Sequence, residues 1–375
     1  MPDTTLIHDA RLIDGGGVTE HGWLLLRDDS IVRRGTGDAP AAGTTFDAQG
    51  AYLAAGYVDI HCHGGGGHSS EDGLDSIRGL VAFQRSHGTT SIVVSLATAP
   101  YESMLQRLAD IRTAAEADPR ILGAHLEGPF LDAGHRGAHD ETLLLVPTPA
   151  LVDEILGVAG GCLRQITLAP EHASPEVLDR LLDAGVRIAV GHTSATADQA
   201  GAAFARGANL LTHAFNGMPG IHHREPGPVV AALRAGATLE LIADGAHVDP
   251  AVMALLFALA PGSVALVTDA MAAAGAPDGE YQLAGHTVLV RGGIARVGEH
   301  GSLAGSTLTL ERAVQGAVAA GATPAAAVEA ATATPADAIG ASSRVGRLAA
   351  GCFADLVLLD RDFAVTAVWS RGQRV

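Results

Sequence analysis

Histidine and carboxylate residues recur where apolar segments of this chain end, and these residue types bind divalent metal ions. His61 and His63 follow the apolar segment YVDI, Glu127 follows ILGAHL, and Asp269 follows VALVT. Imidazole nitrogens and carboxylate oxygens together suit zinc, iron and similar ions. An ion held in this way can activate a water molecule for hydrolysis. The pattern therefore predicts a metal centre capable of hydrolytic chemistry.

The triplet His61-Cys62-His63 has a spacing suited to one ion. Residues two apart in an extended chain point to the same side, so both imidazoles can face the ion while Cys62 points away and is structural. An isolated His-x-His can also be an ordinary polar turn. The four glycines at 64–67 favour a site, because glycine lets a loop pass close to a ligand.

Glu127 and Asp269 each end an apolar segment. Gly128 and Pro129 follow Glu127 directly and end its strand, which leaves the carboxylate at the rim. A solvated loop glutamate is the alternative, but so apolar a strand rarely ends in an unpaired charge. Asp269 is a candidate general base beside a cation. Alternatively, Asp269 has a structural role as the N-cap of the segment that follows it.

The chain contains no lysine, since all 24 of its basic residues are arginine. This excludes Schiff-base catalysis, a P-loop lysine and a metal pair bridged by a carboxylated lysine. Glu127 is then the natural candidate for a ligand shared by two ions.

The middle of the chain alternates strand-like and helix-like segments. Ser174 and Pro175, for example, have the N-cap and first-position pattern of a helix. Eight strands alternating with helices predict a closed parallel (β/α)8 TIM barrel. An open Rossmann sheet is the alternative, but no GxGxxG motif follows the first strand. The expected strands are 57–61, 90–96, 121–126, 165–168, 186–190, 209–213, 238–243 and 264–268.

In a TIM barrel the active site lies at the carboxyl ends of the strands. Any single residue there could be a packing or surface group, but several at convergent positions predict one site. His247 also follows the seventh strand. The candidate ligands at these ends are His61, His63, Glu127, His192, His213 and Asp269.

Both chain ends are strand-rich, which predicts a small β-sandwich domain built from residues 1–54 and 346–375 around a barrel domain at 55–345. A β-hairpin insertion is expected at about 281–297, followed by two alanine-rich helices that close the barrel.

The composition predicts a soluble, cytoplasmic protein. Hydrophobic residues make up 47% of 375 residues, enough for a large core, and the net charge of −17 argues against nucleic acid and anionic membranes. Three dispersed cysteines predict no disulfide framework, and the N-terminal sequence predicts no signal peptide. The apolar segment 251–267 contains Pro261-Gly262-Ser263, so a helix, a turn and a strand are expected instead of a membrane span.

Longer motifs add a family resemblance over nearly the whole chain. THAFNGMP followed by REPG is the most specific of them, and ATPADAIG and GRLAAGCFADLVLLD are more widely shared. The chain resembles the N-acetylglucosamine-6-phosphate deacetylases of the amidohydrolase superfamily. The other matching stretches are YVDIHCHGGGG, HLEGPFLDAGHRGAH, LAPE, GHTSAT, IADGAHVD, LVTDAMAAAG and GSLAGSTLTL.

The resemblance implies roles for these residues. Glu127, His192 and His213 would hold the principal divalent ion, zinc or iron. His61 and His63, with Glu127 and Asp269, would hold a second. Asp269 would take a proton from the activated water and return it to the sugar nitrogen, so that acetate and the amino sugar phosphate leave.

The resemblance also implies substrate contacts. His139 would polarise the acetyl carbonyl, while Asn216, the Gly217 backbone and Arg224 would bind the phosphate. The family pairs as dimers, so a homodimer is expected, with His247 approaching the substrate in the neighbouring subunit's site.

Several alternatives stay open at this point. The epimeric N-acetylgalactosamine 6-phosphate is the alternative substrate. A deaminase or another metal-dependent amidohydrolase shares the His-x-His pair and the final aspartate, but has no place for the NGMP…REPG signature. Relatives bridged by a carboxylated lysine are excluded here, and an inactive scaffold barrel is disfavoured because every expected ligand position is occupied.

Overall fold

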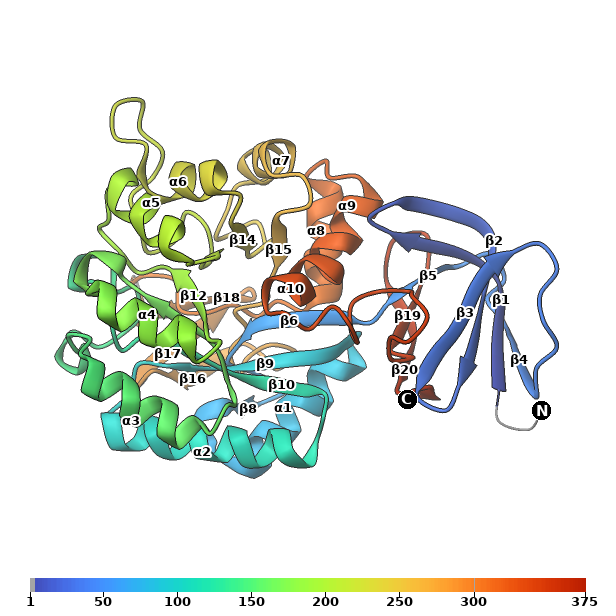
Figure 1. Cartoon of the computed structure of the whole chain (residues 1–375), viewed down its shortest axis with the longest axis horizontal. Coiled ribbons are helices and arrows are strands. Elements are labelled where there is room, and N and C mark those ends of the chain that lie inside the picture. The colour runs from blue at the N-terminus through green and yellow to red at the C-terminus, as the bar shows by residue number, and fades with distance from the viewer. Residues whose placement is uncertain (1–3, 300) are drawn as a thin grey trace.

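The computed structural model describes residues 4–299 and 301–375, and a parallel barrel with surrounding helices forms most of it (Figure 1). The barrel sheet has eight strands in sequential order, and every neighbouring pair in it is parallel. The predicted TIM barrel is therefore confirmed. Its strands are β6 (Tyr57–Cys62), β9 (Thr89–Ala97), β10 (Ile121–Glu127), β11 (Leu163–Leu168), β12 (Arg187–Val190), β13 (Leu210–Leu211), β14 (Thr238–Leu241) and β15 (Val264–Leu266).

The two edges of this sheet meet at their carboxyl ends. Cys62 and Ala270 form a parallel bridge, the backbone N–H of Asp269 donates to the carbonyl oxygen of His61 at 2.8 Å, and that of His63 donates to Ala270 at 2.8 Å. These contacts bring the end of the first strand beside the segment that follows the eighth. The closure therefore occurs at the rim where the predicted ligands lie.

Helices follow the strands and cover the outside of the barrel (Figure 1). Their starts carry the expected caps: Ser174 accepts from the backbone N–H of Val177 at 3.3 Å, ahead of Pro175. None of the described helices is long and apolar enough to span a membrane. The helices that alternate with the strands are α1 (Leu74–Ser86), α2 (Tyr101–Ala117), α3 (Pro149–Ala159), α4 (Pro175–Asp183), α5 (Ala197–Arg206), α6 (Gly227–Ala235) and α7 (Pro250–Leu259).

The segment after β15 differs from the predicted hairpin and two helices. A three-stranded antiparallel sheet, β16 (Gly279–Leu283), β17 (His286–Arg291) and β18 (Ile294–Val297), packs its apolar side chains on the barrel rim. Three helices follow in the described chain, because Thr332 leaves the helical conformation and divides the second predicted helix. They are α8 (Leu310–Ala319), α9 (Pro324–Ala330) and α10 (Ala333–Ala338).

Segments from both ends of the chain join one further sheet, which lies beside the barrel (Figure 1). Leu356 pairs with Ala55, which connects the C-terminal strands to the N-terminal ones. The sheet has an apolar core of its own that includes Leu24, Leu53 and Trp369. Its strands are β1 (Thr4–Asp14), β2 (Gly17–Arg27), β3 (Ser30–Thr36), β4 (Thr44–Asp47), β5 (Tyr52–Ala55), β19 (Leu356–Leu359), β20 (Val365–Ser370) and β21 (Gln373–Arg374).

Candidate metal centre and substrate pocket

The carboxyl ends of five barrel strands bring the predicted ligands into one buried cluster. All of these side chains belong to residues between 0% and 7% exposed. They form two groups of potential donor atoms, each group within 4.8 Å, and Glu127 belongs to both. The first group is His61, His63, Glu127 and Asp269, and the second is Glu127, His192 and His213.

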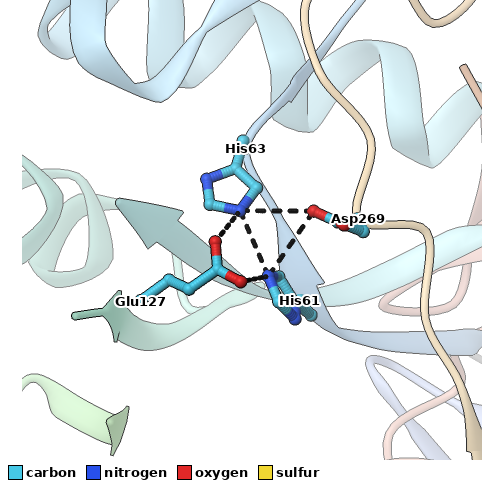
Figure 2. Close-up of side chains that lie close together, drawn as sticks. All are labelled: His61, His63, Glu127 and Asp269. Atoms are coloured by element: carbon cyan, nitrogen blue, oxygen red, sulfur yellow. Dashed lines mark hydrogen bonds and ion pairs between the residues drawn. The ribbon is translucent and has the colours of Figure 1, made fainter. Parts of the chain in front are cut away.

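The first group is shown in Figure 2, where two imidazoles and two carboxylates point toward one another. The Nε2 atoms of His61 and His63 lie 3.1 Å apart. Oε2 of Glu127 lies 3.2 Å from His63 Nε2, and Oδ1 of Asp269 lies 3.4 Å from the same nitrogen. The triplet spacing thus places both rings on one side of the chain, as extended geometry requires.

The second group shares the other oxygen of Glu127. Oε1 lies 3.1 Å from Nε2 of His192 and 3.1 Å from Nε2 of His213. It also lies 3.5 Å from Nε2 of His61 in the first group. The Glu127 carboxylate therefore stands between the two groups, with Oε1 facing His192, His213 and His61 and with Oε2 facing His63.

The hydrogen bonds of His192 test whether this donor set fits a cation. Its Nδ1 lies 2.8 Å from the carbonyl oxygen of His135, which can only accept, so Nδ1 carries the hydrogen. A neutral ring then presents the lone pair of Nε2 to Glu127 Oε1, which is also an acceptor. Two lone pairs 3.1 Å apart repel unless a proton or cation lies between them. The arrangement fits a bound divalent ion.

The pKa directions agree with that fit. Burial by itself lowers the pKa of His61, but the carboxylates of Glu127 and Asp269 outweigh it and raise the pKa well above its ordinary value. Burial likewise opposes protonation of His63, yet Asp269 and Glu127 raise its pKa to about 9. Burial raises the pKa of Glu127, and its histidine neighbours lower it well below the usual range. The cluster therefore stabilises positive charge at its centre.

Three candidate ligands have backbone conformations that non-glycine residues rarely adopt. The φ angles are 44° at His192, 25° at His213 and 46° at Asp269. A positive φ ends a strand abruptly, which explains why β13 is shorter than predicted. Such conformations cost free energy and cluster at functional sites, where surrounding contacts hold them. Here the backbone N–H groups of Asp269 and His213 are held by His61 O and by Glu240.

Two buried residues that support the cluster were missed by the sequence analysis. Glu240 on β14 contacts His61, with 3.0 Å between Oε2 and Nδ1. His125 on β10 hydrogen-bonds to Ser95 at 2.9 Å, and its ring lies edge-on to His61. A charged or ionisable residue inside an apolar strand, in TLELIA and ILGAHL, was the signal that could have identified both.

A pocket of about 220 Å³ opens above the cluster. Of the predicted substrate-binding residues, His139, Asn216, Gly217 and His247 line it. His247 faces the pocket of its own chain, whereas the resemblance implied a neighbour's site, and its Nδ1 lies 2.8 Å from Oδ2 of Asp244. Gly217 has a φ of 59°, and a Cβ there would lie 2.8 Å from Nδ1 of His192, so a larger residue would displace that ring.

Arg224 does not line this pocket in the described chain. It is exposed on the segment between β13 and α6, which projects from the molecule in Figure 1. Its Nη1 lies 2.7 Å from Nε2 of His223. The structure therefore separates Arg224 from the other predicted substrate contacts.

His139 is held in one tautomer beside Glu127. The backbone N–H of Thr98 donates to its Nδ1 at 3.2 Å, which leaves the hydrogen on Nε2. That Nε2 lies 3.5 Å from Oε2 of Glu127. Burial lowers the pKa of His139 to about 4, so the ring is a neutral N–H donor at neutral pH.

Comparison with known proteins places this geometry in a family. The model of the amidohydrolase family matches residues 52–375. An N-acetylgalactosamine-6-phosphate deacetylase of Escherichia coli O157:H7 is 38% identical over 95% of this chain and 96% of that protein. An N-acetylglucosamine-6-phosphate deacetylase of Vibrio furnissii is 34% identical over 86% of this chain and 82% of that protein.

A solved structure is similar over almost the full length. It is a mutant N-acetyl-D-glucosamine-6-phosphate deacetylase from Mycobacterium smegmatis in complex with N-acetyl-D-glucosamine 6-phosphate, with a TM-score of 0.95, 38% identity and 99% of both chains covered. The sequence matches and the structural match agree in family and in extent. This chain belongs to the amidohydrolase family and, within it, to the family of the N-acetylglucosamine-6-phosphate deacetylases.

Proposed function

We propose that this protein hydrolyses the acetamide of N-acetylglucosamine 6-phosphate and releases acetate and glucosamine 6-phosphate. The observation that carries the proposal is the pair of donor groups sharing Glu127 at the base of a pocket. Pockets of this kind at the carboxyl ends of barrel strands suit metal-assisted hydrolysis. The family supports an amide as the bond that is cleaved.

The metal ligands proposed are Glu127, His192 and His213 for a principal ion, and His61, His63, Glu127 and Asp269 for a second. Neutral imidazoles outnumber carboxylates in this set, which favours zinc or iron over magnesium. An ion bound there supplies an activated water molecule and polarises the amide carbonyl.

Asp269 is the proposed proton carrier. Asp269 is 7% exposed and lines the pocket. Burial raises the pKa of its carboxyl group, but His61 and His63 outweigh burial and lower the pKa below the ordinary value. The group is therefore ionised at neutral pH and can accept a proton from the attacking water. It returns the proton to the sugar nitrogen as the carbon–nitrogen bond breaks.

His139 is the proposed donor to the acetyl oxygen. Its ring hydrogen lies on Nε2 because the Thr98 N–H occupies Nδ1, and the low pKa keeps the ring neutral. A neutral N–H donor beside the carbonyl stabilises the oxyanion that develops during attack. This role requires no change of protonation at His139 during the reaction.

The phosphate is proposed to bind at Asn216, the Gly217 backbone and Arg224, and His247 is proposed as a further substrate contact. Arginine suits phosphate because its planar fork donates two charge-assisted hydrogen bonds. Arg224 is exposed, so its role in the proposal requires that the projecting segment reach a phosphate.

We also propose that the protein is a cytoplasmic homodimer. For the terminal sheet we propose a small β-sandwich domain formed by residues 1–54 and 346–375 around a barrel domain at 55–345.

The epimer N-acetylgalactosamine 6-phosphate is a second candidate substrate, because the 38% identical Escherichia coli relative carries that name. Initial rates with both hexosamine 6-phosphates, and with unphosphorylated N-acetylglucosamine, test the proposal. We expect release of acetate from the gluco 6-phosphate with the highest kcat/KM. Preference for the galacto epimer would reassign the substrate within the family, and equal turnover with the unphosphorylated sugar would contradict phosphate recognition.

A further inference from the structure

Glu240 is a buried carboxylate beneath the metal centre. The proposed reaction gives this residue no role. It lies on β14 and is 0% exposed. Burial of a carboxylate costs free energy unless hydrogen bonds compensate, and a buried polar cluster that is replaced as a whole by apolar side chains often keeps or gains stability. Stability alone therefore gives a weak reason for its presence.

The contacts of Glu240 connect strands on different sides of the barrel. Gln165 on β11 donates from Nε2 to Oε1 at 2.6 Å. The backbone N–H of His213, which follows β13, donates to Oε2 at 3.3 Å. Nδ1 of His61 on β6 lies 3.0 Å from the same Oε2. One carboxyl group thus contacts a residue from each of the two proposed ion sites.

We propose that Glu240 is a positioning residue that keeps the lone pair of His61 Nε2 directed at the metal centre and holds the backbone at His213. The inference rests on the metal centre of the proposed function, and it adds a residue that does not touch the substrate. Hydrogen bonds from a ligating histidine to a carboxylate fix the ring's tautomer and orientation and raise its basicity.

The tautomer follows from the acceptors around His61. Oε2 of Glu240 already accepts the His213 backbone N–H, so it faces His61 Nδ1 as an acceptor and Nδ1 carries the hydrogen. When the ring binds a metal ion it is neutral, and its lone pair is then on Nε2, which lies 3.5 Å from both Glu127 Oε1 and Asp269 Oδ1. His61 is 0% exposed, so bulk solvent does not reach its ring and Glu240 is the acceptor that faces Nδ1.

Two substitutions separate a hydrogen-bonding role from simple filling of space. Glu240→Leu keeps much of the volume but removes the acceptor, which leaves His61 Nδ1 and the His213 N–H unpaired. Glu240→Gln keeps an acceptor toward His61, because Gln165 can rotate its amide and receive the new N–H on its Oε1. That Gln165 oxygen has no hydrogen-bond partner among the described residues. Thr90→Val is a matched control on β9, since the buried Thr90 hydroxyl has no hydrogen-bond partner in the described part of the chain.

The experiment measures zinc affinity and zinc content per chain in chelator-treated and reloaded protein, with circular dichroism as the check of folding. We expect Glu240→Leu to bind at least one ion about 10- to 100-fold more weakly, Glu240→Gln to stay much closer to wild type, and Thr90→Val to match wild type. Wild-type affinity in folded Glu240→Leu overturns the inference. A Glu240→Gln protein as weak as Glu240→Leu also overturns it.

A spectroscopic readout decides the question if Glu240→Leu does not fold. In zinc-loaded, nitrogen-15-labelled protein, the His61 Nδ1–H should give an exchange-protected resonance that is identified by its loss in His61→Gln. We expect that resonance to shift in Glu240→Gln, because a neutral amide is a weaker acceptor than a carboxylate. An unchanged resonance overturns the inference. Failure of the proposed function is a separate outcome. It would be seen in the wild-type protein itself, which would then bind no zinc and would not deacetylate the substrate.

Discussion

The Nε2 atoms of His192 and His213 lie 3.0 Å apart, and each lies 3.1 Å from the same oxygen of Glu127. Donor atoms placed about 2 Å from a tetrahedral ion lie roughly 3.3 Å from one another. The triangle therefore has about the size of one face of a zinc coordination shell. Neighbouring aliphatic packing does not account for three polar atoms converging in this way, whereas a shared cation does.

A double substitution, His61→Gln with His63→Gln, should remove one ion and spare the other. The remaining ligands, Glu127, His192 and His213, form a complete second group. Metal content per chain, measured in protein purified without chelator, should fall from two ions to one. The exposed pair His222→Gln with His223→Gln serves as control. One ion in both the wild type and the first variant would show that His61 and His63 hold no metal.

Removal of the metal should abolish activity and lower the melting temperature. A ligand that binds only the native state adds stability that grows with its concentration. Treatment with a chelator, followed by dialysis, should therefore give an inactive protein that unfolds at lower temperature. Addition of zinc or iron(II) should restore both properties. Full activity in protein shown to be metal-free would contradict the metal centre.

Asp269→Asn should reduce kcat by about 100-fold or more, because an amide cannot carry the proton between water and the sugar nitrogen. KM should change little, and the ion at Glu127, His192 and His213 should remain, since Asp269 lies outside that group. Steady-state kinetics with metal analysis checks both. Asp38→Asn, at an exposed position, is the matched control. A variant with near-wild-type kcat would remove Asp269 from the mechanism.

Arg224→Ala should raise KM for the 6-phosphate substrate with little change in the melting temperature. The side chain is exposed, so its loss affects binding and not the core. Loss of hydrogen bonds to a charged phosphate corresponds to about 2 kcal/mol. Arg234→Ala, at an exposed position on α6, should behave as wild type. An unchanged KM for Arg224→Ala would exclude Arg224 from phosphate binding.

Asp355→Asn should change the pH dependence of stability in the terminal sheet. Burial raises the pKa of Asp355 above its ordinary value, so the folded protein binds this proton more tightly than the unfolded chain. The stability that comes from the protonated form is present at low pH and is lost as pH rises through the raised pKa. The free energy of unfolding of the Asn variant, relative to wild type, should therefore increase with rising pH.

Unfolding by denaturant at a series of pH values measures this difference. Asp47→Asn, on β4 at an exposed position, controls for a general change in net charge. A difference between Asp355→Asn and wild type that is constant with pH would contradict the prediction.

The barrel could be predicted because each of its strands has a recognisable local sequence pattern. Each strand is an apolar run bounded by polar or glycine-rich segments, and all eight expected strands are present within a few residues of their predicted bounds. The candidate ligands could be predicted because parallel strands place all their carboxyl ends on one rim. The third strand of the insertion and the division of the alanine-rich helix were not predicted, although Gly292-Gly293 is a turn signal and Pro335 is a helix-breaking signal.

The sequence by itself determined the alternation of strands and helices, the residue types at the rim and the family. Only the tertiary structure decided which atoms meet. His61 and Glu240 are 179 residues apart, and their contact exists because the barrel closes and brings β6 near β14. Tertiary contacts likewise set the tautomer of His61 through Glu240 and that of His192 through the carbonyl oxygen of His135. They also place His247 in the pocket of its own chain and Arg224 outside it. Such relationships depend on distances across the barrel, which no local pattern of residues encodes.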